Sequence, residues 1–193
     1  MKVMVILGHP QPGSFNHALA DTVADTAREL GHSVIFHDLY QEGFNPLLSA
    51  EEQHAPVFAD PLAEQHAREL VETDGLVIIH PNWFSQAPAM LKGWVDRVFR
   101  ARVAFRFNEQ GRVEGLLKAK VGMVITTANA PLSREAEIGD PLPTLWRETV
   151  FKPSGVPTFV YLPLTPIVVS TLTQRQSWLA QVRELTKQHF PAR

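Results

Sequence analysis

The residues best suited to chemistry stand in a loop that follows the first apolar run of the chain. Residues 3–7 are apolar without alternation, which is typical of a parallel strand covered on both faces. Two glycines and two prolines in residues 8–13 end that strand, and the apolar spacing after Asn16 predicts a helix. A strand that turns into a helix N-terminus directs free N–H groups and the positive end of a dipole at one point. The stretch therefore predicts an anion-binding loop.

The residues that this loop lacks narrow the choice of anion. It has neither the dinucleotide fingerprint G-x-G-x-x-G nor the nucleotide-triphosphate loop G-x-x-x-x-G-K-[ST]. Residues 8–16 hold no Lys or Arg, so a phosphate would depend on backbone amides, the Ser14 hydroxyl, the Asn16 amide and the His9 imidazole. Ser14 and Asn16 are also both good helix N-caps. Flavodoxin-like proteins hold FMN in such cradles; the alternative is an ordinary loop that binds nothing.

A second loop, over residues 80–88, follows another buried apolar run. It places two adjacent aromatic residues, Trp83 and Phe84, between that run and a helix that starts near Pro88. An aromatic pair at the carboxyl end of a strand can border a planar ring. The alternative is that both side chains cover the end of the sheet.

Strands and helices alternate along the chain, as in a parallel sheet with helices on both faces. The expected strands are residues 3–7, 33–38, 76–79, 121–127 and 158–164. Helices are expected after residue 16 and over residues 61–73, 88–99, 142–151 and 174–188, with 39–56 irregular and 104–117 a hairpin around 108–111. This α/β pattern predicts a doubly wound five-stranded parallel sheet of order 2-1-3-4-5. The loops after residues 7 and 79 then face each other at the switch point.

Composition excludes several classes of protein. Proteins that bind nucleic acid are usually basic, so the net charge of −2 argues against nucleic-acid binding. No apolar stretch approaches the roughly 20 residues of a membrane span. No signal-peptide pattern is seen, so we expect a cytoplasmic protein with no membrane insertion. Without cysteine there is no disulfide or thiol chemistry, and the histidines lack ligand spacing, so no metal is expected. Any redox function must then come from a bound cofactor.

Four segments together carry a family resemblance. They are residues 3–16; residues 81–84 followed by 88–94 and 97–99; residues 38–40 with 44–46; and Thr126-Thr127. In these segments the chain resembles the NAD(P)H quinone oxidoreductases of the flavodoxin-like fold. The likeness covers most of the chain through about residue 127 and weakens afterwards.

This resemblance implies one flavodoxin-like flavin-binding domain over residues 1–193. The domain would hold FMN, with FAD as the alternative, and would pass two electrons from NAD(P)H to a quinone or similar acceptor in a ping-pong reaction. The residues implied to bind the cofactor are His9, Ser14, Phe15, Asn16, Pro81, Asn82, Trp83, Phe84, Thr126, Thr127, Ala128 and Asn129. Trp83 and Phe84, together with Phe105 and Phe107, would bind the substrates. No catalytic residue is assigned.

Phe105 and Phe107 indicate a homodimer. They alternate along an extended segment, so both project to one side, and no core within the chain is obvious for them. In the resembling family the equivalent segment closes the flavin pocket of the second subunit. The alternative is that both rings pack under their own hairpin.

Departures from the family pattern leave some questions open. Ala128-Asn129 stands where the family has two glycines, and residues 132–140 contain neither Tyr nor His, so the proton donor is not identified. The arginines Arg97, Arg100, Arg102 and Arg106 are interpreted as a solvated helix end, with binding of the extra phosphate of NADPH as the alternative, and Glu51-Glu52 as surface charge. Two further functions remain alternatives: a flavin-binding accessory subunit of a potassium-efflux transporter, and an electron-carrier flavodoxin, against which the small net charge argues.

Overall fold

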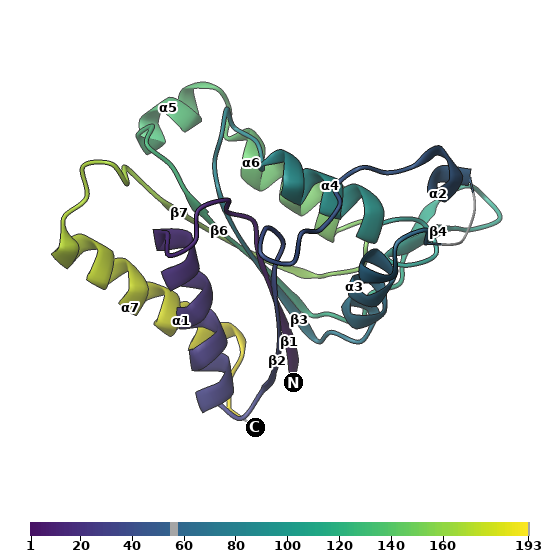
Figure 1. Ribbon diagram of the computed structural model, residues 1–193, viewed down its shortest axis with the longest axis horizontal. Coiled ribbons are helices and arrows are strands. Elements are labelled where there is room, and N and C mark those ends of the chain that lie inside the picture. The colour runs from purple at the N-terminus through teal and green to yellow at the C-terminus, as the bar shows by residue number, and fades with distance from the viewer. Residues whose placement is uncertain (55–57, 193) are drawn as a thin grey trace.

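A five-stranded parallel sheet forms the centre of the molecule (Figure 1). The computed structural model describes residues 1–54 and 58–192. The strands are β1 (Lys2–Leu7), β2 (Ser33–Asp38), β3 (Gly75–Pro81), β6 (Val121–Thr127) and β7 (Thr158–Leu164). Their order is β2-β1-β3-β6-β7 and every neighbouring pair is parallel, which confirms the predicted doubly wound sheet.

Helices cover both faces of this sheet. The long helices α1 (Phe15–Glu29) and α7 (Leu172–His189) lie together on one face (Figure 1). The other face carries α3 (Pro61–Val71), α4 (Ala89–Val98) and a π-helix, η1 (Leu145–Phe151). Three short helices complete the set: α2 (Ala50–His54), α5 (Leu132–Glu137) and α6 (Pro141–Thr144). In the part of the chain described, no helix is both long enough and apolar enough to cross a membrane.

The unbroken apolar strands fill two cores, one on each face of the sheet. Successive side chains of a strand point to opposite faces, so Val3 and Val5 pack with α1 and α7, and Met4 and Ile6 pack with α3 and α4. All four are fully buried. Burying one such side chain contributes about 1.5–3 kcal/mol, which is why apolar residues are needed on both faces.

Two stretches differ from the expected elements. Residues 50–54 form α2 within the segment expected to be irregular, whose Pro56 lies outside the described residues. Residues 142–151, expected to be one helix, form part of α6 followed by η1. In η1 the Trp146 indole is buried and donates a hydrogen bond to His80 Nε2 at 3.2 Å. This contact across the core has no local signature in the sequence.

The predicted hairpin is confirmed at the edge of the molecule. Its strands are β4 (Phe105–Phe107) and β5 (Val113–Gly115), which pair antiparallel and form a sheet of their own. Gly111 closes the turn in a left-handed conformation, with φ of 72°, that favours glycine.

The interpretation of Arg97 and Glu52 as surface charges is wrong, because both are buried. Arg97 Nη2 lies 2.6 Å from Glu52 Oε1, and its Nη1 lies 2.9 Å from Asp60 Oδ2, at the start of α3. Arg97 Nη1 also donates to the Asn45 carbonyl at 2.6 Å. One guanidinium thereby joins α2, α3 and α4, and this tertiary contact accounts for a helix as short as α2.

A second charged cluster lies at the end of β2. The ring of His37 donates from Nδ1 to Glu42 at 2.8 Å and from Nε2 to Glu69 at 2.7 Å, which requires an imidazolium. Burial lowers the pKa of His37, but the hydrogen bonds and charges of both carboxylates outweigh it and raise the pKa overall. Burial raises the pKa of Glu42, whereas its bonds to His37 and His66 lower it to about 2.

We expect His37→Gln to reduce the free energy of unfolding by about 2 kcal/mol at about pH 5.5. The contribution of His37 is complete below its ordinary pKa of 6.5 and is lost as the pH rises through the raised folded-state value. That of Glu42 is complete above 4.5 and is lost as the pH falls toward 2. Urea unfolding should therefore show the largest difference between wild type and variant from about pH 4.5 to 6.5.

The control is Arg28→Gln, which removes an exposed ion pair with Asp25 and should change the stability by less than about 1 kcal/mol at every pH. An equal loss for His37→Gln at about pH 5.5 and about pH 8.5 would contradict a charged His37.

Candidate functional site

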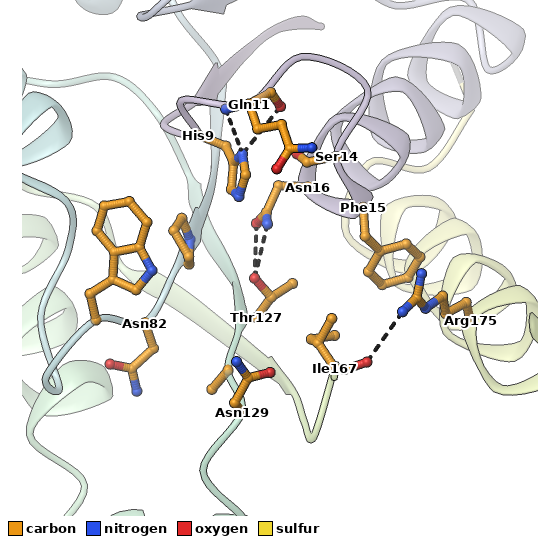
Figure 2. Close-up of a pocket in the computed structure, with 13 residues that line it drawn as sticks. His9, Gln11, Ser14, Phe15, Asn16, Asn82, Thr127, Asn129, Ile167 and Arg175 are labelled. Atoms are coloured by element: carbon orange, nitrogen blue, oxygen red, sulfur yellow. Dashed lines mark hydrogen bonds between the residues drawn. The ribbon is translucent and has the colours of Figure 1, made fainter. Parts of the chain in front are cut away.

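A cavity of about 300 Å³ opens at the carboxyl edge of the sheet (Figure 2). Its walls come from the loop between β1 and α1, the segment after β3, the end of β6 and the start of α7. The residues that line it are His9, Gln11, Ser14, Phe15, Asn16, Pro81, Asn82, Trp83, Thr127, Ala128, Asn129, Ile167 and Arg175. The loops after β1 and β3 thus meet at the switch point of the sheet, where doubly wound folds place their ligands.

The structure brings together most of the residues that the sequence assigned to a cofactor. His9, Ser14, Phe15, Asn16, Pro81, Asn82, Trp83, Thr127, Ala128 and Asn129 all line the cavity. Thr126 is buried elsewhere and donates to the Tyr161 hydroxyl at 3.0 Å. Phe84 is 100% exposed, outside the lining. The binding roles of all these residues stay predictions.

The exposure of Phe84 follows from a tight turn of unusual composition. Trp83 and Gln86 exchange two backbone hydrogen bonds, at 3.1 and 3.0 Å, around Phe84 and Ser85. Both central residues are left-handed, with φ of 55° and 60°, a conformation that costs a non-glycine residue about 1–3 kcal/mol. The Ser85 hydroxyl donates to Glu135 at 3.1 Å, which ties this turn to α5.

Phe105 and Phe107 do not line this cavity in the same chain. Their rings meet edge to face at 5.7 Å on the hairpin, and Phe107 is 62% exposed. They border a separate apolar cavity of about 240 Å³ against α4 and η1. The hairpin is a sheet of its own on that side of the molecule, so a substrate role for these residues requires a second chain.

The β1–α1 loop presents neutral donors. Ser14 is the N-cap of α1, yet its hydroxyl makes no capping hydrogen bond, while Asn16 lies inside the helix. The first N–H groups of a helix have no intrahelical acceptor. His9 Nδ1 lies 3.1 Å from the Gln11 backbone nitrogen and 3.3 Å from the Gln11 carbonyl oxygen, and Figure 2 shows the ring directed into the cavity. Burial lowers the pKa of His9 and favours the neutral ring.

Buried hydrogen bonds hold the three walls in register. The Asn16 amide donates to Thr127 Oγ1 at 2.9 Å, and both side chains are nearly inaccessible to solvent (Figure 2). The Thr127 carbonyl in turn accepts from the Asn82 N–H at 2.7 Å. These bonds join the first turn of α1, β6 and the segment after β3.

His80 supports the wall after β3 from behind. It is completely buried, its Nδ1–H donates to the Pro81 carbonyl at 2.8 Å, and its Nε2 accepts from Trp146 at 3.2 Å. Burial lowers the pKa of His80 to about 4, so the ring is neutral near pH 7. A neutral ring with one donor and one acceptor satisfies both contacts and fixes the orientation of the Pro81 carbonyl.

Sequence analysis missed Gln11, Ile167 and Arg175. The Arg175 guanidinium lies 5.8 Å from the centroid of the Phe15 ring, and its Nη2 donates to the Ile167 carbonyl at 3.2 Å (Figure 2). A cation near the N-terminus of a helix opposes the helix dipole, so the unfavourable position of Arg175 could have indicated that this residue has a role. Ile167 precedes α7 in a segment without a motif, and only the fold brings it to β6.

The sheet order and the cavity at its switch point define a flavodoxin-like α/β protein. Residues 1–185 match the family described as Flavodoxin-like fold, and the chain belongs to that family.

Known relatives extend this comparison. An uncharacterized NAD(P)H oxidoreductase from Haemophilus influenzae is 33% identical over 143 residues, or 72% of this chain and 70% of the relative. An FMN-dependent NADH:quinone oxidoreductase from Pelagibacter ubique is 32% identical over 136 residues, or 65% of this chain and 69% of the relative. The matches span 54% to 70% of the length of the curated relatives. The crystal structure of Smu.1420 from Streptococcus mutans has a TM-score of 0.86 at 30% identity and covers 97% of this chain and 100% of that one.

Thr127→Val should reduce the free energy of unfolding by about 1–3 kcal/mol, because the buried Asn16 amide loses its partner without a change of shape. Chemical denaturation measures the loss. Thr158→Val, at the exposed start of β7, is the matched control and should stay within about 0.5 kcal/mol of wild type. Equal effects at both positions would contradict the role given to Thr127.

Proposed function

We propose that this protein is a flavin-dependent NAD(P)H oxidoreductase that binds FMN at the carboxyl edge of its sheet and reduces a quinone or similar acceptor. The observation that carries the proposal is one cavity with an anion cradle at one end and the Asn82-Trp83 wall beside it. An FMN-dependent NADH:quinone oxidoreductase at 32% identity supports the choice of cofactor and reaction. We also propose that residues 1–193 act as one flavin-binding domain in the cytoplasm.

The residues present fit the two ends of FMN. A phosphate suits the His9 imidazole, the Ser14 hydroxyl and the first turn of α1, whose dipole favours an anion. The place where Gly13 would carry a side chain has no atom within 4 Å, so the loop is open. Trp83 can border a planar ring, and Asn129, just after β6, adds a polar residue to the lining.

FMN held at these residues would supply hydride and two-electron transfer chemistry between the nicotinamide and the acceptor. The residues of this chain hold and orient the cofactor. The bond from Asn82 to Thr127 and the contact of His80 with Pro81 keep one wall rigid. A backbone N–H held at the ring edge would stabilise negative charge that develops there. We assign no residue as proton donor to the acceptor.

Titration with FMN, and with FAD as the alternative cofactor, tests the proposal by flavin fluorescence. We expect micromolar or tighter binding, and oxidation of NADH or NADPH by a soluble quinone with parallel double-reciprocal lines, because donor and acceptor use the same site in turn. Ser14→Ala should raise the Kd for FMN about tenfold, which is about 1.4 kcal/mol, while riboflavin, which lacks the phosphate, should be unaffected. If neither flavin binds, the proposal is wrong. Intersecting double-reciprocal lines would show that donor and acceptor do not use one site in turn.

We further propose that the working unit is a homodimer with shared sites. Phe107 and Val113 are exposed on the hairpin beside the apolar cavity that they line, and such patches usually meet a partner. A symmetric pair buries both patches at once. The hairpin would then supply Phe105 and Phe107 to the substrate side of the second flavin site.

Replacing Phe105 and Phe107 by alanine should shift the protein from dimer to monomer in light scattering and reduce quinone turnover at least about tenfold. Val71→Ala, which removes an exposed apolar side chain from the end of α3, is the control and should change neither quantity. A wild-type protein that is monomeric and fully active at micromolar concentration would contradict the shared site.

A further inference from the structure

A chain of three side chains runs behind the anion cradle. Ser14 Oγ lies 2.8 Å from His17 Nδ1, and His17 Nε2 lies 3.0 Å from Asp38 Oδ2. The other oxygen of Asp38 accepts the N–H groups of Tyr40 and Gln41, both at 3.1 Å. The side chains of His17 and Asp38 are only 19% and 8% exposed. Asp38 is therefore held as an acceptor toward His17.

The protonation state of His17 decides what Ser14 offers to the cavity. A neutral ring must place its proton on Nε2, because the lone pair would otherwise face the carboxylate. Nδ1 then accepts the Ser14 hydroxyl proton, and Ser14 presents lone pairs to an incoming anion. An imidazolium instead donates from Nδ1 to Ser14 Oγ. The hydroxyl proton is then free to bind the anion.

We propose that binding of the flavin phosphate takes up a proton at His17, which makes His17 the positioning residue for the Ser14 hydroxyl. This inference rests on the proposed function. His17 then adds a positive charge that residues 8–16 lack, beside that of Arg175, which lines the same cavity from α7. The protonated ring also donates to Ser14 Oγ, so the Ser14 hydroxyl proton is free to form a hydrogen bond with the phosphate.

The groups around His17 suit this role. The titratable side chains that the structure places against its ring are Asp38, from β2, and His9, whose ring lies edge to face with a centroid distance of 6.2 Å. Burial lowers the pKa of His9, so His9 stays neutral and does not compete for the proton.

Isothermal titration calorimetry of FMN in two buffers of different ionisation enthalpy counts the protons taken up. We expect an uptake of about one proton per FMN, and over the pH range of that uptake the Kd should rise about tenfold per pH unit. Riboflavin is the phosphate-free probe and should bind without uptake.

Two variants separate His17 from the phosphate's own titration. His17→Asn places an amide N–H near the position of Nδ1, so FMN binding should persist without proton uptake and without the pH dependence of wild type. Asp38→Asn should act alike, because its amide donates to Nε2 and leaves the neutral ring with its proton on Nδ1. His189→Asn, at the end of α7, is the control and should keep the uptake.

Each result bears on the inference. FMN binding without proton uptake, or uptake that persists in His17→Asn and Asp38→Asn, overturns the role of His17 and leaves the proposed function standing. Absence of FMN binding by the wild type overturns both. Loss of uptake in the two variants and its retention in the control supports the inference.

Discussion

The cavity depends on Thr127, because this one residue at the end of β6 fixes the other two walls. Its hydroxyl accepts from the Asn16 amide and its carbonyl accepts from the Asn82 N–H. Both contacts are buried, where a polar group left without a partner costs about 1–3 kcal/mol. The β1–α1 loop and the segment after β3 therefore cannot separate without breaking bonds to β6. A preformed cavity results, and a ligand that enters it orders little additional backbone.

The fold was largely predictable because its strands lie between two layers of helices. Burial on both faces demands unbroken apolar runs, and such runs are visible in one sequence. The helix α2 and the π-helix η1 were not predictable in the same way. The helix α2 spans five residues, too few for a periodic pattern, and depends on the contact of Glu52 with Arg97. The sequence alone does not show whether two charged residues form a buried ion pair or lie apart in solvent.

The candidate site was predictable where it follows directly from strand ends. Residues 8–16 and 81–83 meet because the carboxyl ends of parallel strands share one edge of the sheet. Thr126 and Thr127 show the limit of that argument. Successive residues of a strand point to opposite faces, so the pair cannot both face the cavity, and pairing with Tyr161 places Thr126 on the other side. Arg175 comes from an element distant in sequence, which only the fold brings near.

Environment, not residue type, sets the charge of the histidines at this edge of the sheet. His37 lies between two carboxylates, which raise its pKa, whereas burial lowers the pKa of His80 to about 4 and also lowers that of His9. The β1–α1 loop consequently presents neutral donors to the cavity, whereas Arg175 brings a guanidinium to it from α7. Neutral donors act over a hydrogen-bond length and depend on direction. Recognition at this cavity therefore depends on the geometry of the β1–α1 loop far more than on a net charge of −2.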